Sequence, residues 1–252
     1  MKEKSENRRA FPKFMLTLLG ATALGGVLGL GIGICKGAGV GTETVAAGVG
    51  RVLRAVTPWG TPVCAAALGC GVLWLYRGAA RKVKAWDGGD ESEASEAAEQ
   101  RLDWALLLSG VQLLITLFFF AAAVHYELPY VLYHIGVLIV SGGLVIFEQQ
   151  KVVDLTKRMN PEKRGSVYDE KFQKKWLESC DESERRQIGQ AAYHAYMITC
   201  RTCVWLWAGL MICNMVFRTG LMPSFAVLLV LGVLQVSYAL ECIRIEKRGG
   251  AD

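Results

Sequence analysis

Long apolar runs with almost no charged residues are the feature that most constrains how this chain can fold. A hydrocarbon layer of about 30 Å is crossed by about 20 residues of helix. Six runs approach or exceed that length, at residues 14–35, 57–76, 104–124, 130–147, 197–217 and 220–240, and Arg201 is the one charged residue in them. In hydrocarbon a helix satisfies its own backbone hydrogen bonds. The pattern therefore predicts an all-α fold, a polytopic membrane bundle of about six transmembrane helices.

The distribution of basic residues predicts the orientation of these spans. If the N-terminus is cytoplasmic, 24 of the 28 Lys and Arg residues fall in inner segments, which leaves Lys36, Arg51, Arg54 and Arg218 outside. Cytoplasmic loops carry such an excess of Lys and Arg. We therefore predict that both termini are cytoplasmic and that the protein is a multi-pass protein of the cell membrane.

The same topology divides the chain into segments. Residues 1–13 form a cytoplasmic N-terminus, residues 14–147 hold the first four spans with an acidic inner loop at 77–103, residues 148–196 form a cytoplasmic helical segment, residues 197–240 hold the last two spans, and residues 241–252 form a cytoplasmic tail. The first run resembles a signal peptide but is too long for one, so we expect it to stay as an anchor. Residues 36–56 fit either an interfacial helix or a flexible loop.

Local signals place helices in the 148–196 segment. Asn160-Pro161 is a helix breaker, and Phe172, Trp176 and Cys180 recur every four residues, which predicts a short helix with one apolar face. Asp181-x-x-Glu184 has the spacing of a capping box and predicts the start of a helix that continues into the fifth span. The pattern Asp90-x-x-Glu93 predicts a similar start before the third span.

A stripe of small residues in the first span is the sharpest motif. Such a stripe lets a second helix backbone approach closely in lipid, so we expect helix packing, with a pore-lining or oligomerising role as the alternative. Its residues are Ala21, Gly25, Gly29, Gly33, Gly37 and Gly41. The expected partner is the second span, which is rich in small residues at Ala65, Ala66, Ala67, Gly69 and Gly71. The term glycine zipper describes this feature.

Polar residues within the spans form a second candidate site. Ser109, Gln112, Ser141, Arg201 and Gln235 all fall roughly 6 to 13 Å from the inner boundary at 1.5 Å per residue. Polar groups are costly against lipid. We therefore expect either a polar layer centred on Arg201 or, as the alternative, an Arg201 side chain that reaches the interface while the glutamines bond locally.

Signatures of catalysis and metal binding are weak. Cys200-x-x-Cys203 lacks a second Cys pair or a nearby His, and His125, His134 and His194 are widely separated. The sequence contains no P-loop, nucleophile elbow or HExxH motif. We expect packing cysteines, no cofactor, no catalytic residue and no metal site, and we expect the eight cysteines to be reduced.

The segment from Lys171 to Glu182, with Ile188-Gly189 and residues 193–196 after it, resembles an uncharacterised family. Its members are multi-spanning membrane proteins of Gram-positive bacteria and are classed as a domain of unknown function. The resemblance implies a similar span layout along nearly the whole chain. It implies no activity, and no functional residue is carried over from it.

Three functional hypotheses follow. The first is a non-enzymatic membrane component that acts on a membrane or cytoplasmic protein partner through residues 148–196, with Phe172, Lys175 and Trp176 as the candidate partner surface. The second is the permease-like subunit of a transporter with a separate ATPase. The third, a membrane thiol enzyme, depends on Cys200 and Cys203 alone. The basic residues flank the spans and form no recognition motif, so we expect the protein to contact the lipid bilayer and not nucleic acid. Homo-oligomers are a further option.

Overall fold

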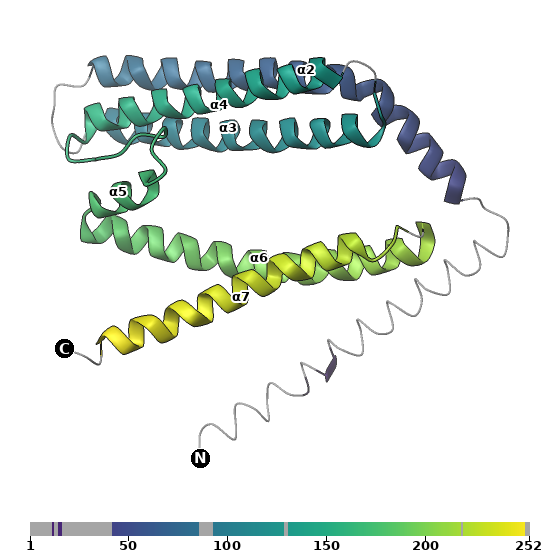
Figure 1. Cartoon of the computed structure of the whole chain (residues 1–252). Coiled ribbons are helices and arrows are strands. Elements are labelled where there is room, and N and C mark those ends of the chain that lie inside the picture. The colour runs from purple at the N-terminus through teal and green to yellow at the C-terminus, as the bar shows by residue number, and fades with distance from the viewer. Residues whose placement is uncertain are drawn as a thin grey trace. The chain divides into compact units, whose positions relative to one another are not determined.

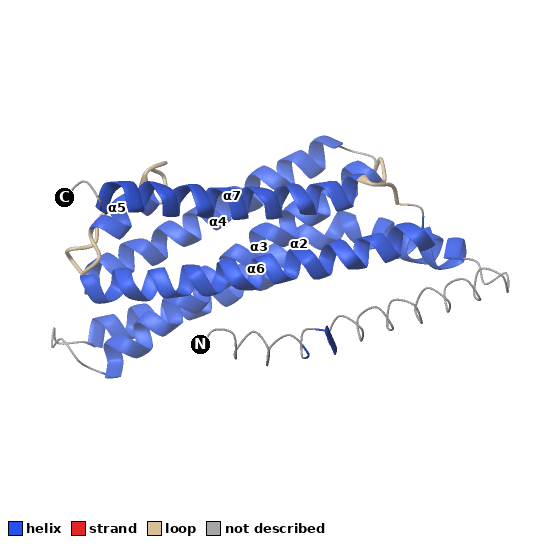
Figure 2. Ribbon diagram, turned by 90° about the horizontal axis from the view of Figure 1, so that it is seen from below, coloured by secondary structure: helices blue, strands red, loops and turns tan. Residues whose placement is uncertain are grey.

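The computed structural model describes residues 42–85, 93–128, 131–217 and 219–249, with residues 12, 15 and 16, and all of its long elements are helices (Figure 1). They are α2 (Thr42–Ala85), α3 (Glu93–His125), α4 (Val131–Met159), α5 (Phe172–Glu178), α6 (Glu182–Phe217) and α7 (Met222–Gly249). No strand occurs in these described ranges (Figure 2). The predicted all-α fold class is confirmed.

Five of the helices are long and apolar enough to cross a membrane. The qualifying segments are Ala47–Ala85, Ser95–His125, Val131–Met159, Glu182–Met215 and Met222–Lys247. Each contains one of the predicted spans two to six, apart from one or two end residues of the fourth, fifth and sixth. The small-residue stripe from Ala21 to Gly41, the first predicted span apart from residues 15 and 16, and Asp90 of the capping pattern lie outside the described residues.

The helices extend well beyond the predicted spans. Helix α2 begins at Thr42, so residues 42–56 are helical, and the flexible-loop alternative for residues 36–56 is wrong for that stretch. The acidic 77–103 loop is likewise helical at both of its ends, in α2 and α3. Most charged residues have good helix propensity in water. A helix that extends past its apolar span therefore continues until a helix breaker ends it. At Asn160-Pro161 this stop is observed, since α4 ends at Met159.

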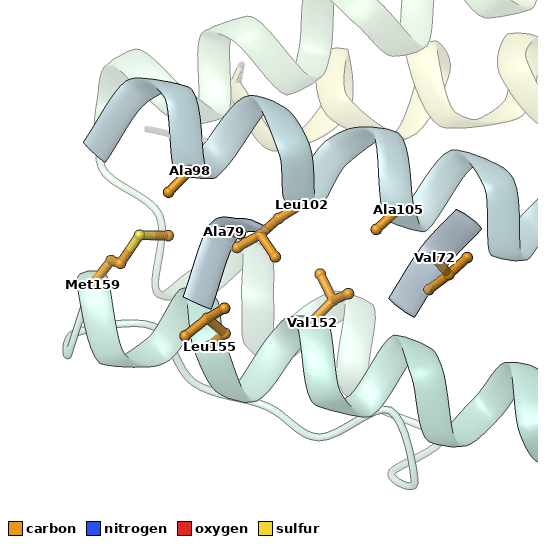
Figure 3. Packing of buried hydrophobic residues seen from close by; sticks show 8 residues of the cluster. All are labelled: Val72, Ala79, Ala98, Leu102, Ala105, Val152, Leu155 and Met159. Carbon is orange, nitrogen blue, oxygen red and sulfur yellow. The ribbon is translucent and has the colours of Figure 1, made fainter. Parts of the chain in front are cut away.

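The chain divides into two compact units. The first unit, residues 49–190, contains most of α2, all of α3, α4 and α5, and the first turns of α6. Its apolar core lies between α2, α3 and α4 and consists of Val72, Ala79, Ala98, Leu102, Ala105, Val152, Leu155 and Met159 (Figure 3). Alanines at three of these positions let the helix backbones approach closely.

In the second unit, α6 and α7 form a helical hairpin. The turn between them is held by the Asn214 Oδ1 atom, which accepts a 2.8 Å hydrogen bond from the Gly220 backbone N–H. Gly220 has φ +80°, a conformation that glycine adopts without strain. Farther along the two helices, the rings of Tyr196 and Tyr238 stack with centroids 4.7 Å apart.

Candidate partner-binding site at the cap

Residues 160–180, which we call the cap, form the compact connection between α4 and α6. Helix α5 supplies the centre of the cap, and its Phe172 and Trp176 rings lie 5.6 Å apart, one turn along the same face. The four-residue spacing predicted this short helix and its apolar face. Both rings are half-buried.

The start of α6 holds the end of the cap through a capping box. The Asp181 Oδ1 atom accepts a 2.7 Å hydrogen bond from the Glu184 N–H, and the Glu184 Oε2 atom accepts a 3.0 Å bond from the Asp181 N–H. These reciprocal bonds satisfy backbone donors that a helix start leaves free. The predicted capping box is therefore confirmed.

Lys163 is the buried cation of the cap. Only 6 % of the residue is exposed, and its Nζ atom forms an ion pair with Glu184 and lies 3.5 Å from the Cys180 Sγ atom. Burial alone would lower the pKa of Lys163, but the hydrogen bond to Glu184 and the charge of that carboxylate raise it above its ordinary value. Lys163 therefore stays charged and connects the loop after α4 to the first turn of α6.

A second set of bonds fixes the cap to α4. The Gln150 Oε1 atom accepts hydrogen bonds from the Ser166 hydroxyl at 3.0 Å and from the Val167 N–H at 2.8 Å. Lys157 donates to the Gly165 carbonyl oxygen. Gly165 itself has φ +128°, which an L side chain rarely adopts. The cap is thus fixed at both ends.

Two clefts separate the cap from the ends of α3 and α4. The larger, of about 580 Å³, is bordered by Phe172 and Trp176 and by three carboxylates, Asp103, Asp169 and Glu170. The smaller, of about 280 Å³, adjoins Lys163, Cys180 and Glu184. An aromatic and acidic lining suits a basic side chain, because the ring faces and the carboxylates both attract cations.

Asp169, which is half-buried, and Asp181, which is exposed, are carboxylates whose charge is stabilised by local hydrogen bonds. A hydrogen bond from Lys175 lowers the pKa of Asp169, and a backbone hydrogen bond from Glu184 lowers the pKa of Asp181. Depressed carboxylate pKa values add stability that is present above the ordinary value near 3.8 and is lost as the pH falls through the folded-state value. Both carboxylates are therefore ionised at neutral pH.

Of the predicted partner surface, only Lys175 is exposed to solvent, whereas Phe172 and Trp176 are half-buried. Phe172 and Trp176 face the larger cleft, and Lys175 is paired with Asp169. The apolar side chains that the cap exposes most are instead Tyr168 at 66 % and Leu177 at 43 %. No periodic pattern distinguished these two residues, because exposure here depends on how α5 packs against α3 and α4.

Three residues of the predicted polar layer lie together in the first unit. Ser109, Gln112 and Ser141 are buried between α3 and α4. Ser141 shares a 2.9 Å hydrogen bond with Thr116, and Gln149 Nε2 donates to Ser109 Oγ at 3.3 Å. Sequence reasoning missed Thr116, although it continues the face of Ser109 and Gln112 by one further turn.

The other two members of that layer differ. Arg201 and Gln235 lie on α6 and α7 in the second unit, and both residues are exposed. The buried polar cluster of the first unit therefore does not depend on Arg201. A layer that unites all five residues remains a prediction.

The candidate metal and thiol positions form no cluster in the part of the chain that the structure describes. No group of three or more His, Cys, Asp or Glu side chains there could hold a metal ion. Cys203 is buried, Cys200 is half-buried, and the cysteines of the described ranges are free thiols.

Comparison with known proteins gives a family. The family model described as "Protein of unknown function (DUF3169)" matches residues 8–240, which is most of the chain and includes the whole cap. No curated protein and no solved structure matches the chain. The expected resemblance to an uncharacterised family is confirmed at this level, and the chain belongs to the DUF3169 family.

Proposed function

We propose that this protein is a non-enzymatic component of the cell membrane that binds a partner protein through its cap, on the cytoplasmic side. One observation carries the proposal: the cap is fixed at both ends, yet it exposes the large apolar side chains Tyr168 and Leu177. A surface that is already rigid before binding loses less conformational entropy on association. A partner would therefore meet a preformed platform.

The chemistry of the platform indicates what the partner presents. Lys174 lies one turn before Leu177 on α5, and its pairing with Glu178, at 3.8 Å, is exposed and therefore weak. An apolar partner surface with acidic residues at its rim would complement this arrangement. Charge complementarity of this kind contributes mostly to association rate and specificity.

We expect site-specific photo-crosslinking to capture the partner protein at the platform. With a photoreactive phenylalanine analogue at Tyr168 or at Leu177, the full-length protein in its native membrane should give one adduct of the same mass from both positions. Lys174→Glu should weaken the adduct from position 177 by reversing the complementary charge.

The matched control carries the analogue at Glu127, in the turn between α3 and α4 at the other end of those helices. An adduct of equal yield from position 127, or none from positions 168 and 177, would contradict the proposed platform.

The second candidate is a permease-like subunit that works with a separate ATPase. The buried polar side chains of Ser109, Gln112, Thr116 and Ser141 favour it, because polar groups inside spans often mark substrate pathways. An ATPase that co-purifies with the protein in fixed stoichiometry would support this candidate over the first. The glycine zipper of the first span and the Gram-positive origin of the family also remain proposals.

A further inference from the structure

A groove in the first unit has an apolar wall and a polar end. It lies between α2 and α4, has a volume of about 460 Å³, and is lined by Ala65, Ala66, Gly69, Leu144 and Phe147, among others. Both helices are long and apolar enough to cross a membrane, so acyl chains are the expected surroundings of this groove. Its small residues leave room that a linear hydrocarbon chain can fill.

Buried polar atoms without partners lie beside the groove, near Gly69. Gln112 is 1 % exposed, and neither its Nε2 nor its Oε1 atom has a hydrogen-bond partner among the described residues. The Glu148 Oε2 atom is in the same situation. A Cβ atom on Gly69 would lie 3.0 Å from Glu148 Oε1 and 3.9 Å from Gln112 Oε1, so both side chains approach the same point. Such atoms are costly to leave unpaired.

A basic residue stands beside this acid. Lys151 also lines the groove, one turn after Glu148 on α4, and its Nζ atom lies 5.3 Å from the centroid of the Phe147 ring. Glu148 directly follows the last residue of the predicted fourth span, so both charges lie toward the predicted inner end of that span. An apolar chain with an ammonium group and a phosphate at one end would match the groove in both shape and charge.

We infer that this groove binds phosphatidylethanolamine, with an acyl chain along Ala65, Ala66 and Gly69, the primary ammonium on Glu148 and the phosphate on Lys151. The primary ammonium has three N–H donors for the carboxylate of Glu148, which lines the groove and has one oxygen without a hydrogen-bond partner. A quaternary choline headgroup has the same charge but no N–H donor, and a glycerol headgroup has no cation. The unpaired atoms therefore favour ethanolamine over both.

Native mass spectrometry of the delipidated full-length protein can test this inference. We titrate it with dioleoyl phosphatidylethanolamine, phosphatidylcholine and phosphatidylglycerol, whose acyl chains are identical. One ethanolamine lipid should be retained about tenfold better than either other lipid, which corresponds to about 1.4 kcal/mol, because only its headgroup donates hydrogen bonds to a charged group. Glu148→Gln should remove the preference, and Glu162→Gln, an exposed change in the cap, should keep it.

A second variant tests the groove independently of its charge. Gly69→Leu fills the space with a side chain and should lower retention of all three lipids, whereas Gly136→Leu, where nothing lies within 4 Å of an added Cβ, should not. Equal retention of the three lipids by the wild-type protein would overturn the inference. So would a Gly69→Leu variant that loses stability with unchanged lipid retention, because the groove would then be filled by protein, such as the glycine-rich first span.

Discussion

Lys163→Met should free the cap and raise the amide hydrogen-exchange rate of residues 160–180 by about 30-fold, which corresponds to about 2 kcal/mol. The substitution removes the ion pair to Glu184 and the contact with Cys180 while Met fills most of the volume. Breaking a fully buried pair costs about 3–5 kcal/mol. We expect less here because Glu184 is 37 % exposed and can be rehydrated.

Two comparisons isolate this effect. Lys174→Met removes an equally charged side chain of the cap, but its pairing with Glu178 is at the surface, so exchange should stay within about twofold of wild type. The double variant Lys163→Met with Glu184→Gln should lose less than the sum of the two single variants, since neither partner is then left charged and alone. Equal exchange in Lys163→Met and Lys174→Met would show that Lys163 does not hold the cap.

Gly60→Ala should destabilise the protein by about 2 kcal/mol against denaturation in mixed detergent micelles, an overpacking cost of the usual size. A Cβ atom at Gly60 would meet three carbons of the Phe119 ring, and the most distant of these, Cδ1, lies 2.7 Å away. Because a ring cannot yield as a flexible chain end does, α2 and α3 have to separate.

Two glycines serve as matched controls for that prediction. Nothing lies within 4 Å of a Cβ added to Gly110, so Gly110→Ala should gain about 1 kcal/mol of helix propensity. At Gly78 an added Cβ meets mainly the end of the Arg101 side chain, which can move, so Gly78→Ala should be tolerated. A Gly60→Ala variant as stable as Gly110→Ala would contradict the close approach of α2 and α3.

Much of the fold was predictable because strong local signals agree with it. Apolar runs without charge indicated the spans, Asn160-Pro161 ended α4, and Asp181 with Glu184 started α6. The helix extensions past the bilayer were not predictable from apolarity, because charged residues at 77–85 and 148–159 are neutral toward helix formation. Only a breaker or a cap defines such an end.

The candidate site was predictable only where spacing along one element decides it. The four-residue period of Phe172 and Trp176 predicted α5 and its apolar face. Burial of Lys163 was not predictable, since its partners are Cys180 and Glu184, 17 and 21 residues away. Depth alone grouped Arg201 with Ser109 and Gln112, and depth does not say which face of a helix is covered.

The side of the membrane on which the cap lies is the most direct test of the proposed cytoplasmic platform. In a cysteine-free background, Tyr168→Cys and Glu127→Cys each introduce one exposed thiol, and a membrane-impermeant maleimide is added to intact cells and to permeabilised cells. We predict that Glu127→Cys is labelled in intact cells and that Tyr168→Cys is labelled only after permeabilisation, as the Lys and Arg distribution requires. Labelling of Tyr168→Cys in intact cells would place the cap outside and contradict the account.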